Sequence, residues 1–252
     1  MNPLEKGVHF GDRVDAYVEG RKGYPKEMFD FLAAKVPACS EKSALDLGCG
    51  TGEFSTKPLI ELFHSVHACD VDERMLAKAL KKLNGVPLVR SSAEELPYRD
   101  GQFGVITMFT SFHWFCNDQA VCQISRTLED NGYVFLSAGG GGRPLKNKVQ
   151  EILENVIGRK IIDPKEEYDP EGMLAKHNFK TIAKAEFKAV EYYTADEALK
   201  RCQSSSTWND VVAENKEEEA CGKLRDFFTK YIEDNGPIAQ ETKKRVLLMQ
   251  KN

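Results

Sequence analysis

The chain has 252 residues and a formal net charge of −4, with 41% hydrophobic and 29% charged residues. This length and composition suit one soluble domain with an ordinary apolar core, so we predict a single domain over residues 1–252. A slightly acidic chain lacks the basic surface that nucleic acid and anionic membranes require, which argues against both as partners. No run of about eighteen apolar residues occurs, so no membrane span is predicted.

The chain opens with a polar segment, and the first amphipathic helix follows it. Apolar residues at helical spacing predict this helix from about Pro25 to Val36, with Met28, Phe29 and Leu32 on its buried side. Pro25 suits the first turn of a helix, because the N–H that proline lacks has no partner there. The break at Gly23-Tyr24-Pro25 therefore separates residues 1–24 from the helix.

Short apolar segments then alternate with helical patterns. The predicted strands are Ala44–Leu47, Val66–Cys69, Val86–Arg90, Phe103–Phe109 and Tyr133–Leu136. The predicted helices are Phe54–Phe63, Asp118–Leu128, Leu145–Ile157 and one capped by Asp72, with Met75, Leu76, Ala79, Leu80 and Leu83 on its apolar face. This alternation predicts an α/β fold with a parallel sheet. Phe103–Phe109 is almost wholly apolar, which places it at the centre of the sheet.

The last third of the chain predicts two strands and two helices. Apolar and polar residues alternate from Phe179 to Thr194, which indicates a strand with a bulge. Ala195–Gln203 and Glu217–Glu233 are predicted as helices, and Val246–Met249 as a last short strand. The basic trio Lys243-Lys244-Arg245 is predicted to be ordinary exposed surface.

A glycine-rich turn follows the first predicted strand. Gly48, Gly50 and Gly52 occupy alternate positions, where glycine allows the backbone to approach a ligand closely. Asp70 ends the next strand, and a carboxylate at that point accepts hydrogen bonds from a ribose diol. Strand, glycine turn, helix and acidic strand end together predict a site for a nucleoside cofactor.

Two kinds of nucleoside cofactor compete for this site. The dinucleotide motif has the spacing G-x-G-x-x-G and binds pyrophosphate at the start of a helix. Here the spacing is G-x-G-x-G, and Asp46 stands two residues before the first glycine. A carboxylate there repels phosphate and suits a ligand with a cationic group, which is the charge pattern of S-adenosylmethionine.

Three further segments are considered together with the glycine turn: Ser92-Ala93-Glu94-Glu95-Leu96-Pro97-Tyr98, Gln123–Leu128 with Asn131-Gly132-Tyr133, and Ser111-Phe112-His113-Trp114-Phe115. With the glycine turn, the chain resembles class I S-adenosylmethionine-dependent methyltransferases of the small-molecule type 11 branch, similar to trans-aconitate methyltransferase. The resemblance covers residues 15–138 well and the rest in general character. It implies a Rossmann-like α/β fold whose seven-stranded, mostly parallel sheet has helices on both faces. It also implies an N-terminal lid and first helix in residues 1–37, a cofactor-binding core in 38–140, and remaining sheet with a small helical substrate cap in 141–252.

The resemblance also implies which residues bind the cofactor. The expected set is Tyr17, Arg21, Asp46, Gly48, Cys49, Gly50, Asp70, Val71, Met75, Ala93, Glu94, Phe109 and Ser111. Asp46, Gly48 and Gly50 are expected at the methionine moiety and Asp70 at the ribose. Val71, Ala93 and Glu94 are expected to surround the adenine, and Phe109 or Ser111 to pass under the methionyl part.

Four residues are expected at the methyl acceptor. His113 follows the central strand at the carboxyl edge of the sheet, where ligands bind in α/β folds, and is the candidate catalytic base. Tyr24, Trp114 and Trp208 are expected to contact the substrate. Arg21, in the expected lid, would also suit an anionic substrate group.

We predict methyl transfer to a small molecule by in-line displacement, with an oxygen nucleophile favoured and a carboxylate as one option. An N-methyltransferase acting on an amine or protein, a nicotinamide-dependent oxidoreductase and a non-catalytic cofactor-binding protein remain as alternatives. Seven irregularly spaced cysteines indicate reduced thiols and no metal site, which favours a cytoplasmic protein. A monomer or a homodimer is expected.

Overall fold

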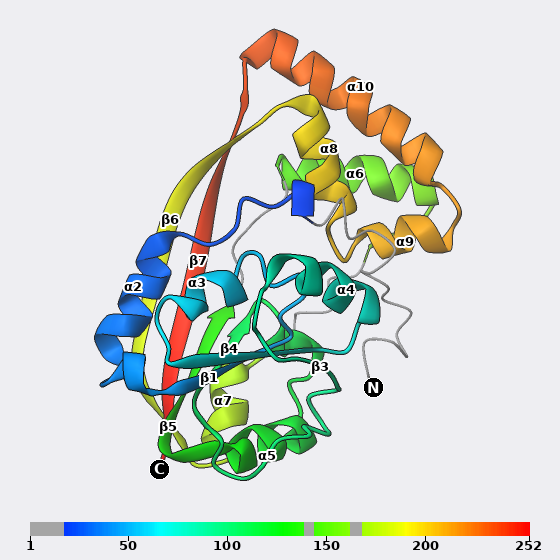
Figure 1. Cartoon of the computed structure of the whole chain (residues 1–252). Helices are drawn as coiled ribbons and strands as arrows, with labels where there is room; N and C mark the ends of the chain where they lie inside the picture. Colours follow the sequence, from blue (N-terminus) through cyan, green and yellow to red (C-terminus); the bar gives the residue numbers. More distant parts are fainter. Residues whose placement is uncertain (1–17, 139–143, 162–167) are drawn as a thin grey trace.

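The computed structural model describes residues 18–138, 144–161 and 168–252. In that part of the chain, seven strands form one sheet in the order β3-β2-β1-β4-β5-β7-β6 (Figure 1). The strands are β1 Ser43–Leu47, β2 Ser65–Asp70, β3 Leu88–Arg90, β4 Phe103–Phe109, β5 Leu128–Ala138, β6 Phe179–Tyr193 and β7 Ile238–Lys251. Strands β1 to β5 pair in parallel, and β7 pairs antiparallel with both β5 and β6. The predicted α/β sheet, with β4 at its centre, is confirmed.

Helices cover both faces of this sheet. The helices of the described residues are α2 Lys26–Lys35, α3 Thr56–Ile60, α4 Glu73–Lys82, α5 Asp118–Thr127, α6 Lys146–Ile157, α7 Pro170–Ala175, α8 Ala195–Gln203, α9 Trp208–Ala213 and α10 Glu217–Asn235. On β4, Val105 and Phe109 pack with apolar residues of α2 and α3. Ile106 and Met108 pack on the other side with α5 and α7. This alternation follows from the two-residue period of a strand.

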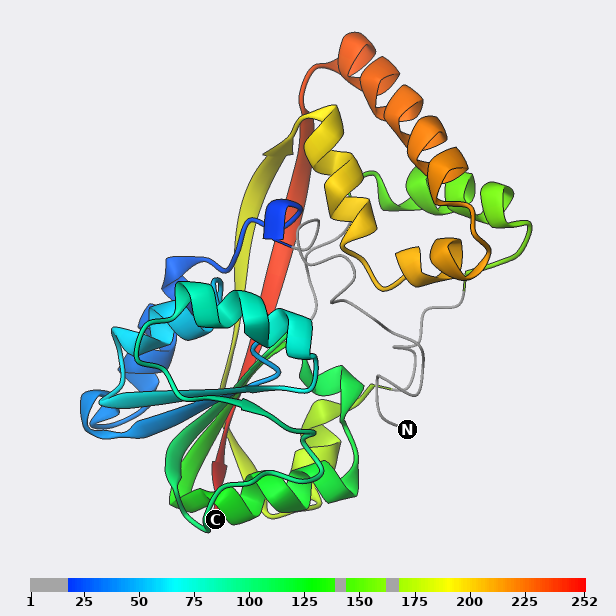
Figure 2. The ribbon, with the colours of Figure 1, turned by 45° about the vertical axis from the view of Figure 1, so that its right-hand side comes forward.

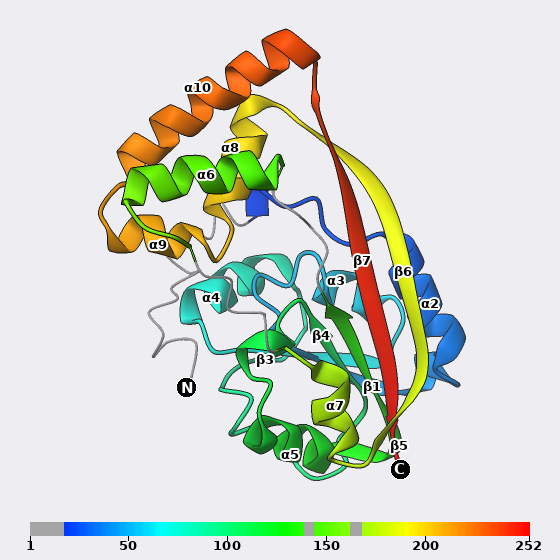
Figure 3. The same ribbon diagram turned by 180° about the vertical axis from the view of Figure 1, so that it is seen from behind.

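Four further helices, α6, α8, α9 and α10, gather at one end of the molecule (Figures 1 and 3). They share a separate apolar core that includes Leu153, Leu199, Val211, Leu224 and Phe228. Strands β6 and β7 run from the sheet up to these helices, as Figure 2 shows from a second direction. We call these four helices the cap. It sits beyond the carboxyl ends of the parallel strands.

Several local predictions need correction. The helix predicted over Phe54–Phe63 is limited to α3, and the short last strand predicted over Val246–Met249 extends back to Ile238 as part of β7. Helices α7 and α9 were not predicted. Leu80, expected on the buried side of α4, is 69% exposed. The buried residues of that helix are Met75 and Ala79. The seven cysteines all fall within the described residues and are free thiols.

Candidate functional site

The turn after β1 brings the backbone close to the loop that follows β4. Gly48 has a φ of +73°, in the left-handed region that favours glycine. A Cβ added to Gly48 would lie 2.5 Å from the Cβ of Ser111, too close for any side chain. The Ser111 hydroxyl donates a hydrogen bond of 2.8 Å to the Leu47 carbonyl, which holds the two loops together. Position 48 therefore requires glycine, for its conformation and for space.

Asp46 is fully buried beneath the turn, with 0% of its surface exposed. Its Oδ2 accepts hydrogen bonds from the hydroxyls of Ser55 at 2.7 Å and Thr56 at 2.6 Å. Its Oδ1 accepts one from Thr107 at 3.2 Å. Because no part of Asp46 is accessible, the structure corrects the expected direct contact with the methionine moiety. Asp46 instead ties the start of α3 to β1 and β4, and so fixes the shape of the turn.

Burial raises the pKa of Asp46 to about 6, the charge of Asp70 adds to this rise, and the three hydroxyl donors oppose it. A pKa above the unfolded value means that native Asp46 holds its proton between about pH 4 and 6, where the unfolded chain has lost it. Stability from this group is therefore present at low pH and is lost as the pH rises through 6.

We expect the Asp46→Asn variant to lack this pH dependence. Between pH 5 and pH 7, the free energy of unfolding of the wild type should fall by about 1 kcal/mol relative to that of the variant. Urea unfolding of both proteins at the two pH values measures this difference. Equal changes in the two proteins would contradict the raised pKa.

Asp70, at the end of β2, lies against the same turn. Its Oδ2 accepts a hydrogen bond of 2.7 Å from the Gly50 N–H, and its Oδ1 one of 2.9 Å from the Asp72 N–H. Burial raises the pKa of this carboxyl. The Val71 N–H is a third backbone donor to this carboxylate. A carboxylate has about four lone-pair sites, so accepting capacity remains for a ribose hydroxyl. The expected ribose contact fits this geometry and stays a prediction.

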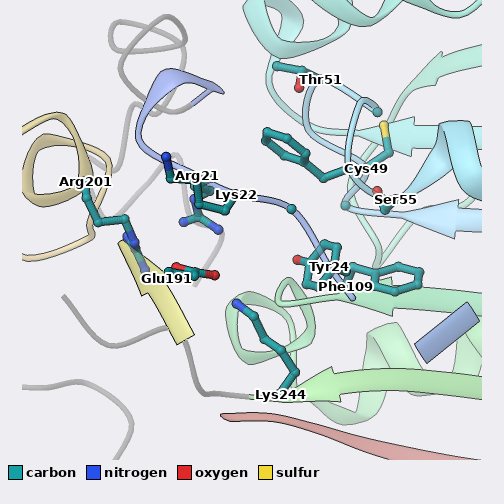
Figure 4. Close-up of a pocket in the computed structure, with 14 residues that line it drawn as sticks. Arg21, Lys22, Tyr24, Cys49, Thr51, Ser55, Phe109, Glu191, Arg201 and Lys244 are labelled. Atoms are coloured by element: carbon teal, nitrogen blue, oxygen red, sulfur yellow. The ribbon is translucent and has the colours of Figure 1, made fainter. Parts of the chain in front are cut away.

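A pocket lies between the glycine turn, the segment before α2, and the point where β6 and β7 approach the cap. Its lining residues are Arg21, Lys22, Gly23, Tyr24, Gly48, Cys49, Thr51, Gly52, Phe54, Ser55, Phe109, Glu191, Arg201 and Lys244. Figure 4 shows Tyr24, Cys49, Ser55 and Phe109 on one side and the charged residues on the other. Of the predicted site residues, Arg21, Tyr24, Gly48, Cys49 and Phe109 line it. Tyr24 is fixed there by a 2.9 Å hydrogen bond between its hydroxyl and that of Thr110.

The three residues expected at the adenine, and Met75 of the expected cofactor set, lie outside this pocket. Ala93 and Met75 are buried, and Val71 is half-buried. Glu94 accepts a 2.9 Å hydrogen bond from the Asn117 amide at its Oε1. Their contact with adenine stays a prediction. Tyr17 falls outside the described residues.

His113 and Trp114 also lie outside the pocket. They belong to a short 3-10 turn, Phe112–Trp114, directly after β4. Their ring centroids are 4.8 Å apart, and the His113 ring lies 6.0 Å from that of Tyr168. Trp114 and Tyr168 pack against the apolar core on the α5 side of the sheet. Their roles as base and substrate contact stay predictions.

Trp208, expected at the substrate, lies elsewhere. It begins α9, is 2% exposed and belongs to the apolar core of the cap. The structure therefore replaces the expected substrate contact with a packing role, because a buried indole at the centre of the cap has no surface left for a ligand.

We expect Trp208→Phe to lower the free energy of unfolding by about 1–2 kcal/mol, because it removes buried contacts from the cap. Cofactor affinity should stay within about twofold of wild type. Chemical unfolding and calorimetric titration of S-adenosylhomocysteine measure the two effects. A large loss of affinity without loss of stability would restore a ligand role for Trp208.

Four charged residues of the pocket were missed from the sequence: Lys22, Glu191, Arg201 and Lys244. The predicted final strand began at Val246, so Lys244 was assigned to exposed surface. A signal was present, because strand residues two apart share a face and Val246 and Leu248 are apolar. Continued backward along β7, this period places Lys244 on the same face as Val246. Arg201 sits on the predicted helix Ala195–Gln203, and nothing in the sequence indicates which way that helix faces.

The fold and the site have the arrangement found in class I methyltransferase domains. Such domains have a glycine turn after the first strand and an acid at the end of the second. Their ligands bind at loops on the carboxyl edge of the parallel sheet. S-adenosylmethionine is the cosubstrate of this class. The residues present fit it, since Asp70 ends β2 beside the glycine turn and its carboxylate keeps accepting capacity for a ribose hydroxyl beyond its backbone donors.

Comparisons with known proteins agree. Residues 45–136 match the profile of a methyltransferase domain family. The chain is 32% identical over 128 residues to an uncharacterized methyltransferase of Mycobacterium tuberculosis, covering 51% of each protein. It is 26% identical over 204 residues to a malonyl-[acyl-carrier protein] O-methyltransferase of Geobacter sulfurreducens, covering 73% of this chain and 68% of that protein. The chain thus spans about half the length of the first of these relatives.

A solved structure shows the same fold. Phosphoethanolamine N-methyltransferase 2 of Haemonchus contortus, in complex with phosphomonomethylethanolamine and S-adenosylhomocysteine, superposes with a TM-score of 0.53 at 17% identity. The match covers 94% of this chain and 56% of that one. Among the described residues, no helix is long and apolar enough to cross a membrane. The described residues also contain no group of three or more metal-ligating side chains.

Proposed function

We propose that this protein transfers a methyl group from S-adenosylmethionine to an oxygen nucleophile of a small molecule, with a carboxylate favoured. The observation that carries the proposal is the pocket of Figure 4, which joins the glycine turn to a group of cationic side chains. One side of this pocket is suited to the cofactor and the other to an acid. The O-methyltransferase from Geobacter sulfurreducens among the relatives supports transfer to oxygen.

This reaction depends mainly on how the acceptor and the methyl donor are positioned relative to each other. S-adenosylmethionine supplies a methyl group that its positive sulfur already activates. The chain must hold the acceptor oxygen in line with that group and exclude water, which is a contribution of orientation and desolvation. Tyr24 and Phe109, whose ring centroids are 4.9 Å apart, form an apolar wall of the pocket for this purpose.

A carboxylate acceptor needs no general base, because it is ionised at neutral pH. Among the described residues that line the pocket, Glu191 is the one carboxylate, and it accepts a hydrogen bond from the Tyr193 hydroxyl. The described part of the lining thus offers cations to an acid and contains no histidine that could take the proton of an alcohol. His113, outside the pocket, is our candidate base for an acceptor that carries a proton.

Two measurements test the proposal. Calorimetric titration of S-adenosylhomocysteine should show saturable binding, and NADH at the same concentration should show none. Incubation with methyl-labelled S-adenosylmethionine and a set of small carboxylic acids should then yield a labelled product that mild base releases as methanol, as expected for an ester. If S-adenosylhomocysteine does not bind at millimolar concentration, the proposal is overturned. Label in a base-stable product would rule out a carboxylate as the acceptor.

A further inference from the structure

A cysteine, a histidine and an aspartate meet at the surface, at the end of the molecule away from the cap. Asp118 and Cys122 lie four residues apart in α5, so their side chains share one face of that helix. His177 follows α7, which lies beside α5 (Figures 1 and 3). Its Nε2 is 2.8 Å from Oδ1 of Asp118, and its Nδ1 is 3.8 Å from the Sγ of Cys122. The imidazole thus stands between a carboxyl group and a thiol.

The order of these three groups determines what the imidazole can do. A carboxylate accepts hydrogen bonds and donates none, so a neutral His177 donates its Nε2–H to Asp118. The lone pair of Nδ1 is then left to accept the proton of the Cys122 thiol. A nucleophile beside a base that a third group orients is the arrangement of nucleophilic thiol chemistry. Metal ligands converge on one point, whereas here the imidazole separates the other two groups.

The chain holds the imidazole in place on both sides. The backbone N–H of His177 donates a 2.9 Å hydrogen bond to the Leu174 carbonyl, and the side chain is 19% exposed. Asn117 caps α5 by accepting a 2.9 Å hydrogen bond from the Ala120 N–H, so the carboxylate of Asp118 is not needed as the cap. The proton acceptor is therefore positioned before a reagent arrives, which lowers the cost of alignment.

Cys122 differs in exposure from the other six cysteines of the chain. It is exposed, whereas Cys116 and Cys221 are half-buried and the remaining four are buried. Burial raises the pKa of Cys116 to about 11 and also raises the pKa of Cys221. A buried, protonated thiol is a poor nucleophile. Cys122 combines access from solvent with a neighbouring proton acceptor.

We propose that Cys122 is a modification site for small disulfides, with His177 as the acceptor of its proton and Asp118 as the residue that orients the ring. Because Cys122 is exposed on a helix, its reagent arrives from solvent and needs no binding pocket. Thiol–disulfide exchange suits such a site, since it requires a thiolate and a route for one proton. The inference does not rest on the proposed function, because the three residues lie outside the pocket of Figure 4.

The step conserves atoms and electrons. As the sulfur of Cys122 attacks one sulfur of the disulfide, its proton passes to Nδ1 of His177. A new S–S bond forms to Cys122, the S–S bond of the reagent breaks, and the released thiolate takes the proton from His177. One thiol and one disulfide are consumed, and one mixed disulfide and one thiol are formed. The disulfide is the only co-reactant that the step requires.

The test measures how fast each cysteine reacts with 2-hydroxyethyl disulfide, a small disulfide without charge. The full chain is incubated with excess reagent at pH 7 and at pH 10, quenched with acid and mapped by peptide mass spectrometry. All seven cysteines then report from one sample. The proteins are wild type, His177→Gln and Lys176→Gln. Lys176 is the matched control, because it is the adjacent residue, is exposed, and its replacement removes a charge while leaving the imidazole in place.

At pH 7 we expect Cys122 of wild type to react at least about tenfold faster than Cys221, and to slow by at least about tenfold in His177→Gln. Lys176→Gln should react within about twofold of wild type, because an exposed charge is screened by solvent and salt. At pH 10 an exposed thiol ionises without a neighbouring base. Wild type and His177→Gln should then agree within about twofold.

Four results would overturn the inference. Equal rates for Cys122 and Cys221 at pH 7 would remove the evidence for a reactive site. An unchanged rate of Cys122 in His177→Gln at pH 7 would mean that exposure alone governs it. An equal slowing in Lys176→Gln would reduce the effect to local charge. A slowing in His177→Gln that persists at pH 10 would show that His177 acts through packing and not as a proton acceptor.

Discussion

Replacing Gly48 with Ala is expected to abolish measurable binding of S-adenosylhomocysteine, with at least about a hundredfold loss of affinity, and to lower the free energy of unfolding by about 2–4 kcal/mol. About 1–2 kcal/mol comes from forcing a residue with a Cβ into the left-handed region. The remainder comes from the clash with Ser111, whose Cβ would lie 2.5 Å away. Relief of that clash must move the turn or the loop after β4, and either movement displaces the cofactor site. Calorimetry and urea unfolding measure the two effects.

Gly85→Ala is the matched control for Gly48→Ala. Gly85 has nearly the same φ, +75°, but an added Cβ there meets nothing within 4 Å. This variant should lose only the conformational part, about 1–2 kcal/mol, and should keep its affinity for S-adenosylhomocysteine. If both variants bind the ligand like wild type, the turn after β1 does not hold the cofactor.

Replacing Asp70 with Asn is expected to weaken S-adenosylhomocysteine binding by about tenfold to a hundredfold. The amide keeps the size of the carboxylate but loses its charge and replaces one accepting oxygen with a donor. Loss of a hydrogen bond to a charged group costs about 1.5–3 kcal/mol, which corresponds to this range of affinity. Calorimetric titration at neutral pH measures the change.

Asp72→Asn controls for charge and for stability. Asp72 lies two residues further along and caps α4 by accepting hydrogen bonds from the N–H groups of Arg74 and Met75. Asparagine caps a helix about as well as aspartate, so this variant removes the same charge with little structural change. It should bind S-adenosylhomocysteine within about threefold of wild type. Equal losses in both variants would show that the effect is one of charge alone.

Local sequence pattern was sufficient to predict the sheet. The strand Phe103–Phe109 was placed with its observed bounds because it is buried on both faces and Thr107 is its one polar residue. The glycine turn was predicted because the need for a left-handed backbone at Gly48 restricts the choice of residue. Asp72 was predicted as the cap of α4 because capping depends only on neighbours two or three residues away.

The predictions that failed depended on distant parts of the chain. Asp46 looked like a ligand contact, but hydroxyls nine and ten residues later, and that of Thr107 on β4, enclose it. Trp208 was predicted at the substrate, but its position follows from the packing of four cap helices, which no local pattern reveals.

The sequence by itself determined the fold class, the glycine turn and the acid that ends β2, because each depends on backbone conformation or on periodicity within a few residues. Only the tertiary structure decided which charged residues meet in the pocket. Arg21, Arg201 and Lys244 are far apart in the chain, and what brings them together is the length of β6 and β7 and the packing of the cap. Strand β6 pairs with β7 along its fourteen residues, and β5 pairs with it from Arg245 to Gln250. This pairing stabilises a strand whose polar residues do not by themselves predict one.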